Sequence, residues 1–205
     1  MTGRRDHWET VWTTKSPEAV SWHQDDPAPS LAMIEAAGLR KDAAIVDVGG
    51  GASVLVDRLL ERGHVHVAVL DVSGAALRVA AERLGPLGDD VHWIESDVTS
   101  WSPVPGLFDL WHDRAVLHFL TDPAEQAAYA AVLKRATGPG ATVILATFAP
   151  DGPEKCSGLP VRRHDGATLS ALLGPDFRLI EERRQAHVTP GGSTQNFAWC
   201  RFARV

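Results

Sequence analysis

The chain has 205 residues, 44% of them hydrophobic and 22% charged, which is the composition of one globular domain with a substantial core. Its 20 Lys and Arg residues against 26 Asp and Glu residues give a formal net charge of −6, and no dense basic block is present, which argues against a nucleic-acid partner. The sequence shows neither the apolar core of a signal peptide nor an apolar run of about 18 residues, so it predicts a cytoplasmic protein without a membrane span.

The first 40 residues are expected to form a helical cap, followed by the main part of the domain over residues 41–205. Three of the seven tryptophans, Trp8, Trp12 and Trp22, fall in this first segment. One interpretation is that they only pack the segment onto the rest of the protein, and the other is that they also close over a ligand.

Short apolar runs alternate with Ala-rich helical stretches from residue 44 onward, as expected when parallel strands are covered by helices on both faces. The predicted strands are residues 44–48, 66–71, 91–97, 107–113 and 141–148. The predicted helices are residues 54–63, 73–85, 122–138 and 165–174. The fold class is therefore α/β, with a doubly wound and mostly parallel sheet.

The last third of the sequence changes in character. Residues 149–164 are rich in Pro and Gly and lack periodicity, which predicts a functional loop or lid. Residues 177–188 and 194–205 alternate with a period of two around a Gly-containing turn, which predicts a hairpin whose last strand is antiparallel to the rest of the sheet.

A run of three glycines follows the first predicted strand, in the sequence Asp-Val-Gly-Gly-Gly-Ala-Ser. Glycine is needed where a first strand-to-helix turn passes close to a ligand, because it has no Cβ. The dinucleotide fingerprint would require a third glycine at Val54, so the loop does not fit NAD. It fits instead the pattern acidic-x-Gly-x-Gly as Asp47, Gly49 and Gly51, with Gly50 between the last two.

Two more acidic residues follow the next two predicted strands. Asp71, with Val72 after it, ends the second strand, the position from which a carboxylate reaches the ribose hydroxyls of a bound nucleotide. Asp97 ends the third strand, where it can accept a hydrogen bond from an adenine amino group while the Val98 amide binds a ring nitrogen.

These motifs make residues 40–205 resemble the class I S-adenosylmethionine-dependent methyltransferases. The resemblance implies a seven-stranded sheet, S-adenosylmethionine as methyl donor and S-adenosylhomocysteine as product. It also implies that the glycine turn, Asp71 and Asp97 bind the donor, that the acceptor is reached from the end of the fourth strand, and that no metal is required.

The segment after the fourth predicted strand concentrates the candidate catalytic residues His112, Asp113, Arg114 and His118. It lacks the Asn-Pro-Pro-aromatic motif of methyltransferases that act on base or glutamine nitrogens. It resembles instead the Trp-Asp-Arg-Gly segment of thiopurine S-methyltransferases, and the N-terminal tryptophans resemble those of the same family. That resemblance implies that Trp12 and Trp22 cap the donor and that Asp113 and Arg114 lie at the acceptor site.

The sequence leaves the acceptor open among three hypotheses. The first is a small molecule with sulfur or a related soft nucleophile, favoured because Arg114 would attract an anion and repel an ammonium group. The alternatives are a protein lysine and a non-catalytic nucleotide-binding module. Either His112 or His118 would need a pKa near neutrality to act as a base, and both could instead be structural, as could Cys156. Monomer and dimer both remain open.

Overall fold

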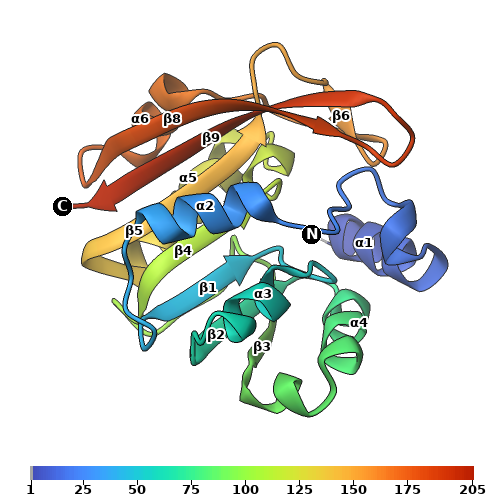
Figure 1. Ribbon diagram of the computed structural model, residues 1–205. Helices are drawn as coiled ribbons and strands as arrows, with labels where there is room; N and C mark the ends of the chain where they lie inside the picture. The colour runs from blue at the N-terminus through green and yellow to red at the C-terminus, as the bar shows by residue number, and fades with distance from the viewer. Residues whose placement is uncertain (1) are drawn as a thin grey trace.

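The computed structural model describes residues 2–205 and shows a central sheet with helices on both faces (Figure 1). Met1, the first residue of the expected cap, lies outside the described residues. The chain begins with α1 (Thr2–Thr14), a 3-10 turn η1 (Pro17–Ala19) and α2 (Ala28–Ala36), so the expected cap segment is largely helical.

The sheet has seven strands in the order β3-β2-β1-β4-β5-β9-β8. The strands that form its parallel part are β1 (Ala44–Val48), β2 (His66–Asp71), β3 (His92–Glu95), β4 (Phe108–Arg114) and β5 (Thr137–Phe148). The hairpin of β8 (Phe177–Val188) and β9 (Thr194–Arg204) completes it, with β9 antiparallel to β5. The expected seven-stranded sheet with an antiparallel last strand is confirmed.

The sheet separates the apolar core into two layers, each covered by helices. On one face, α2, α3 (Leu55–Glu61) and α4 (Gly74–Leu84) cover the sheet through side chains such as Ile34, Leu59 and Leu77. On the other face, α5 (Pro123–Ala136) and α6 (Gly166–Leu173) pack through residues such as Leu133 and Leu169. Because both faces are covered, β1, β2 and residues 143–148 of β5 are almost wholly buried rather than alternating with solvent.

Capping residues set where several helices begin. The Ser73 hydroxyl accepts a hydrogen bond from the Ala76 amide at the start of α4, and the Asp122 carboxylate accepts one from the Ala124 amide at the start of α5. At the other end of α5 the helix passes directly into β5 at Thr137, four residues before the strand was expected, since Gly138 and Pro139 cannot continue the helix.

Two other expected strand ends are wrong. The third strand ends at Glu95 rather than residue 97, because the Asp97 side chain accepts a hydrogen bond from the Thr99 amide and turns the chain. β4 continues through Arg114. The expected loop 149–164 contains a small hairpin of β6 (Lys155–Cys156) and β7 (Leu159–Pro160), and η2 (Gly85–Asp90) and η3 (Leu117–Phe119) add short 3-10 turns elsewhere.

Candidate active site

The glycine turn lies between β1 and α3, at the carboxyl edge of the sheet. Gly49 has φ +68, and a Cβ placed on it would lie 1.9 Å from Cγ2 of Val116. Gly51 has φ +44, and its Cβ would lie 2.9 Å from Oδ2 of Asp71. Both positions therefore require glycine for backbone conformation and for space. The backbone of this turn forms part of the wall of the cavities described below.

Asp71 is the last residue of β2 and is 8% exposed. Its Oδ1 accepts a hydrogen bond from the Ser73 amide at 2.9 Å. Burial raises the pKa of Asp71 to about 7. The hydrogen bond from the Ser73 amide acts in the opposite direction and lowers this pKa, whereas the nearby Asp47 carboxylate raises it further. Asp97 follows β3 in a turn and receives the Thr99 amide and hydroxyl on the same oxygen, Oδ1.

Two adjoining cavities open at this edge. The first holds about 780 Å³ of space, part of it open to solvent, and is lined on one side by Gly49, Asp71, Val72, Asp97 and Val98. The second holds about 620 Å³, again partly open, and its wall includes Asp47, Gly49, Gly50 and His112. Trp12, Trp22, Gly49 and Arg114 border both cavities. All the residues expected to bind the donor thus line one cavity or both, apart from Gly51. Gly51 lies beside the Asp71 carboxylate instead.

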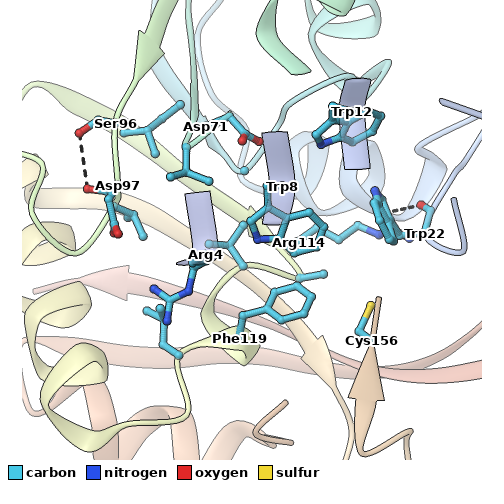
Figure 2. Close-up of a pocket in the computed structure, with 17 residues that line it drawn as sticks. Arg4, Trp8, Trp12, Trp22, Asp71, Ser96, Asp97, Arg114, Phe119 and Cys156 are labelled. Carbon is cyan, nitrogen blue, oxygen red and sulfur yellow. Dashed lines mark hydrogen bonds between the residues drawn. The ribbon is translucent and has the colours of Figure 1, made fainter. Parts of the chain in front are cut away.

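Helix α1 supplies the opposite wall of the first cavity. Arg4, Trp8 and Trp12 recur every four residues, so they lie along one side of the helix, and all three line the cavity (Figure 2). The rings of Trp8 and Trp22 meet edge to face with centroids 5.6 Å apart, and Trp8 meets Phe119 in the same way at 5.0 Å. The result is an aromatic wall facing Asp71 and Asp97.

Strand β4 sends its consecutive side chains to opposite faces of the sheet, which separates the three candidate catalytic residues that it carries. His112 and Arg114 face the side of α2 and the cavities. Asp113 faces the side of α5. The expectation that Asp113 and Arg114 lie together at one site is wrong, because the strand continues through residue 114 and keeps its period of two.

His112 is held between two buried partners. Its Nδ1 lies 2.7 Å from Oδ1 of Asp47, and its Nε2 lies 3.0 Å from Oγ of Ser30 in α2. The donor and acceptor roles depend on the tautomer of the ring: with the hydrogen on Nδ1, that atom donates to the Asp47 carboxylate and Nε2 accepts from the Ser30 hydroxyl. Both ring nitrogens are engaged within the fold, although the residue borders the second cavity.

Arg114 reaches from the end of β4 toward the N-terminal segment (Figure 2). Its Nη1 donates to the Trp22 carbonyl at 2.9 Å, and its guanidinium carbon lies 5.3 Å from the centroid of the Phe197 ring. Nη2 is buried and has no hydrogen-bond partner among residues 2–205. Burial lowers the pKa of Arg114 to about 10, which leaves the group cationic at neutral pH.

Asp113 instead organises the turn after β4. Its carboxylate accepts hydrogen bonds from the Val116 amide at 2.9 Å, the Leu117 amide at 3.1 Å and the Tyr129 hydroxyl at 2.6 Å. Burial raises the pKa of Asp113 to about 6 against the opposing effect of the Tyr129 hydroxyl. These bonds hold Ala115 at φ +71, a left-handed conformation that is uncommon for a residue other than glycine.

His118 is fully buried and does not line either cavity. Its ring packs against Phe119 and Phe148, with centroid distances of 4.4 and 4.8 Å. Burial lowers the pKa of His118 to about 3, and the neighbouring His164 and Arg114 lower it further. The near-neutral pKa expected of a general base is therefore absent at this residue.

Cys156 is carried into the first cavity by the β6–β7 hairpin, beside Arg114. Burial raises the pKa of its thiol to about 11, so the group is neutral at physiological pH. Sequence patterns did not indicate a role for Arg4 or Phe119 in the wall of the cavity. A repeat of four residues in Arg4, Trp8 and Trp12 could have pointed to the contribution of α1.

Within residues 2–205, no three His, Cys, Asp or Glu side chains are grouped so as to hold a metal ion. In the same part of the chain, every helix is too short or too polar to cross a membrane.

Comparison with known proteins connects this site to one family. Residues 45–140 match the family model described as "Methyltransferase domain". No curated protein sequence matches the chain.

Many solved structures share the fold at low sequence identity. A structure concerned with the conversion of a disulfide bond into a thioacetal group during echinomycin biosynthesis matches with a TM-score of 0.78 and 19% identity, over 98% of this chain and 93% of that one. The N-methyltransferase NodS from Bradyrhizobium japonicum, in complex with S-adenosylhomocysteine, matches with a TM-score of 0.72 and 15% identity, over 97% and 99%. The 1,6-didemethyltoxoflavin-N1-methyltransferase of Burkholderia thailandensis matches with a TM-score of 0.69 and 19% identity, over 100% and 85%.

The three structures described above do not confirm the partial resemblance to thiopurine S-methyltransferases. The family model, the sheet order and the glycine turn with its two following acidic residues agree with one another. Residues 45–140 thus match a methyltransferase domain, and the whole chain has the fold of S-adenosylmethionine-dependent methyltransferases of known structure.

Proposed function

We propose that this protein transfers a methyl group from S-adenosylmethionine to a small-molecule acceptor that binds as an anion, with a thiolate as the preferred nucleophile. The observation that carries the proposal is Arg114, a buried cation whose Nη2 has no partner among the described residues and which borders both cavities. A buried guanidinium donor without a partner is costly unless a ligand supplies an acceptor.

The donor fits the wall formed by the glycine turn, Asp71 and Asp97. The two glycines leave the space that a Cβ would fill, and in this proposal Oδ2 of Asp71, which lies beside the turn, accepts from ribose hydroxyls. In this proposal Asp97 and Val98 bind the adenine, Asp47 and the glycine turn bind the methionine end, and residues 1–40 cap the donor with Trp12 and Trp22. The donor supplies a sulfonium-bound methyl group, which passes to an acceptor lone pair and leaves neutral S-adenosylhomocysteine.

The acceptor side of the first cavity offers no acidic side chain other than the two carboxylates assigned to the donor, within the described part of the chain. Its ionisable groups are Arg4, Arg114 and the neutral thiol of Cys156. A thiolate needs no base on the protein, because it ionises in solution close to neutral pH. An ammonium group would meet the Arg114 charge instead, which disfavours a protein lysine.

The aromatic wall supports a small organic acceptor. Trp8, Trp22 and Phe119 enclose a space of the size found for small-molecule sites. Two structural neighbours are compatible with this class of acceptor. One concerns chemistry at sulfur in a natural product, and the other carries 1,6-didemethyltoxoflavin with S-adenosylhomocysteine.

The proposal is tested by calorimetric titration with S-adenosylhomocysteine, followed by turnover of matched aryl thiols, phenols and amines. Arg114→Met and Arg114→Lys are compared with the wild type and with Arg178→Met, an exposed arginine on β8. We expect Arg114→Met to lower kcat/KM for thiols by about ten- to a hundredfold, the usual value of a charge-assisted hydrogen bond, with less than about a twofold change in the Kd of S-adenosylhomocysteine.

Different failures have different meanings. A large loss of S-adenosylhomocysteine affinity in Arg114→Met would place the guanidinium on the donor and refute its role with the acceptor. Binding without turnover of any small nucleophile, together with methylation of a protein band, would favour the lysine alternative. Binding without any methylation would favour a non-catalytic nucleotide-binding module.

A further inference from the structure

Glu9 joins the start of the chain to the start of α4. Its Oε2 accepts a hydrogen bond from the Ser73 hydroxyl at 2.6 Å and from the Ala75 amide at 3.3 Å, and its Oε1 lies 3.4 Å from Nη2 of Arg78. A carboxylate at this position satisfies a free amide of the first helical turn and interacts favourably with the positive end of the helix dipole. We call these bonds to Ser73 and Ala75 the Glu9 contact.

The Glu9 contact lies next to the donor-binding carboxylate. The Ser73 amide donates to Asp71 while the Ser73 hydroxyl donates to Glu9, so a single buried residue bonds to both carboxylates. The hydrogen bond from Ser73 lowers the pKa of Glu9, which keeps it ionised at neutral pH. Glu9 thus holds α1 at the point where α1 borders the ribose-binding side of the cavity.

The position of α1 also decides whether the cavity is covered. Trp8 precedes Glu9 in the helix and points into the cavity, while Glu9 points toward α4. Other contacts hold the beginning of α1, since Arg4 donates to both carboxylate oxygens of Glu125 at 2.8 Å and Arg5 pairs with Glu95. Figure 1 shows α1 beside α4 and below the β6 hairpin, over the carboxyl edge of the sheet.

We propose that Glu9 is a positioning residue that holds α1 closed over the bound donor, so that the donor or its product leaves only when the Glu9 contact breaks. The inference uses the donor site assigned above but is independent of the acceptor. A ligand that touches α1 binds the closed arrangement better than an open one, so weakening the Glu9 contact lowers the closed population and the apparent affinity together.

The test measures the dissociation rate of S-adenosylhomocysteine by stopped-flow tryptophan fluorescence. Excess S-adenosylmethionine prevents S-adenosylhomocysteine from rebinding. The variants are Glu9→Ala, Glu9→Gln and the matched control Asp6→Asn, which removes a charge from an exposed position of the same helix. We expect dissociation to be about five- to tenfold faster in Glu9→Ala, given the usual strength of a hydrogen bond to a charged group in a partly exposed site. Glu9→Gln keeps an oxygen acceptor for Ser73, so its effect should be about two- to threefold.

Two further readouts separate positioning from general destabilisation. The KM for the donor should rise in Glu9→Ala without a fall in kcat, and hydrogen exchange of the α1 amides in the presence of S-adenosylhomocysteine should accelerate while exchange in β1 does not change. Dissociation rates of Glu9→Ala and Asp6→Asn within about twofold of each other would overturn the proposal. If Glu9→Ala unfolds, the same comparison is made with Glu9→Gln, and a rate equal to that of the control refutes it. Absence of any S-adenosylhomocysteine binding by the wild type would instead refute the donor site.

Discussion

The raised pKa of Asp71 predicts that donor affinity depends on pH. In the empty protein, burial favours the neutral carboxyl and raises the pKa of Asp71 to about 7. Ribose hydroxyls need an acceptor, so the donor binds the carboxylate form. A proton must therefore leave Asp71 before the donor binds, and the apparent Kd rises as pH falls below about 7. The expected increase is about tenfold between pH 8 and pH 6, since each pKa unit corresponds to 1.36 kcal/mol.

The effect on folding has the opposite sign. Because the pKa of Asp71 is higher in the folded than in the unfolded chain, its stabilising effect is present at low pH and is lost as pH rises through about 7. Ligand affinity and the stability of the empty protein should thus change in opposite directions over the same pH range. Burial is the largest cause of the raised pKa of Asp71, and the nearby Asp47 and Glu9 carboxylates raise it further.

The assay is calorimetric titration of S-adenosylhomocysteine from pH 5.5 to 8.5, with thermal unfolding measured at each pH. Asp71→Asn cannot titrate and should bind weakly with an almost constant Kd. Asp97→Asn serves as the matched control, because it removes the other proposed donor carboxylate and should weaken binding while keeping the pH dependence. A wild-type Kd that stays constant between pH 6 and 8, in protein that remains folded, would refute the reasoning.

Three further substitutions test the fold around the site. Gly49→Ala should abolish S-adenosylhomocysteine binding, because its Cβ would lie 1.9 Å from Val116. The control Gly63→Ala is at a position that also has a positive φ but has open space around it, so it should lower the free energy of urea unfolding by only about 1 kcal/mol. Asp113→Ala should lower the free energy of unfolding by about 2–4 kcal/mol, since it leaves two amides and a hydroxyl without their acceptor; wild-type stability in this variant would contradict the role in the turn. His118→Phe removes a group whose pKa falls to about 3 on folding, so the stability that His118 contributes is present above pH 6.5 and is lost as pH falls. The free energy of unfolding of the variant, relative to that of the wild type, should therefore be about 2 kcal/mol more favourable at pH 5 than at pH 8. An equal shift of the urea midpoint at both pH values would exclude this.

Local sequence signals were sufficient to predict the sheet and the places of the glycine turn and Asp71 at its carboxyl edge. The strand at 44–48 is confirmed at both ends, and Asp71 ends β2 as expected. These positions follow from patterns of neighbouring residues, namely apolar runs that end in glycines or an acidic residue. The positions of Gly49 and Gly51 were predictable for the same reason, since a backbone that must pass a ligand or take a positive φ restricts the residue type.

The acceptor side was less predictable because it depends on registry and on contacts between distant segments. Extending β4 by one residue sends Asp113 and Arg114 to opposite faces of the sheet, and sequence-based strand ends are not that accurate. The low pKa of His118 follows from enclosure by Phe119 and Phe148, which no local pattern shows. Arg4 reaches the cavity only because α1 docks on α4 and α5.

The two edge strands of the sheet have a consequence for the behaviour of the protein in concentrated solution. An exposed edge can pair with a strand of another molecule and start aggregation. Here β3 has only four residues, and the long edge strand β8 carries the charged residues Glu182, Arg183 and Arg184 at consecutive exposed positions. An incoming strand would have to bury these charges or match them in register. We therefore expect substitutions in this charged stretch, which is far along the sequence from the glycine turn, to change aggregation without altering the candidate active site.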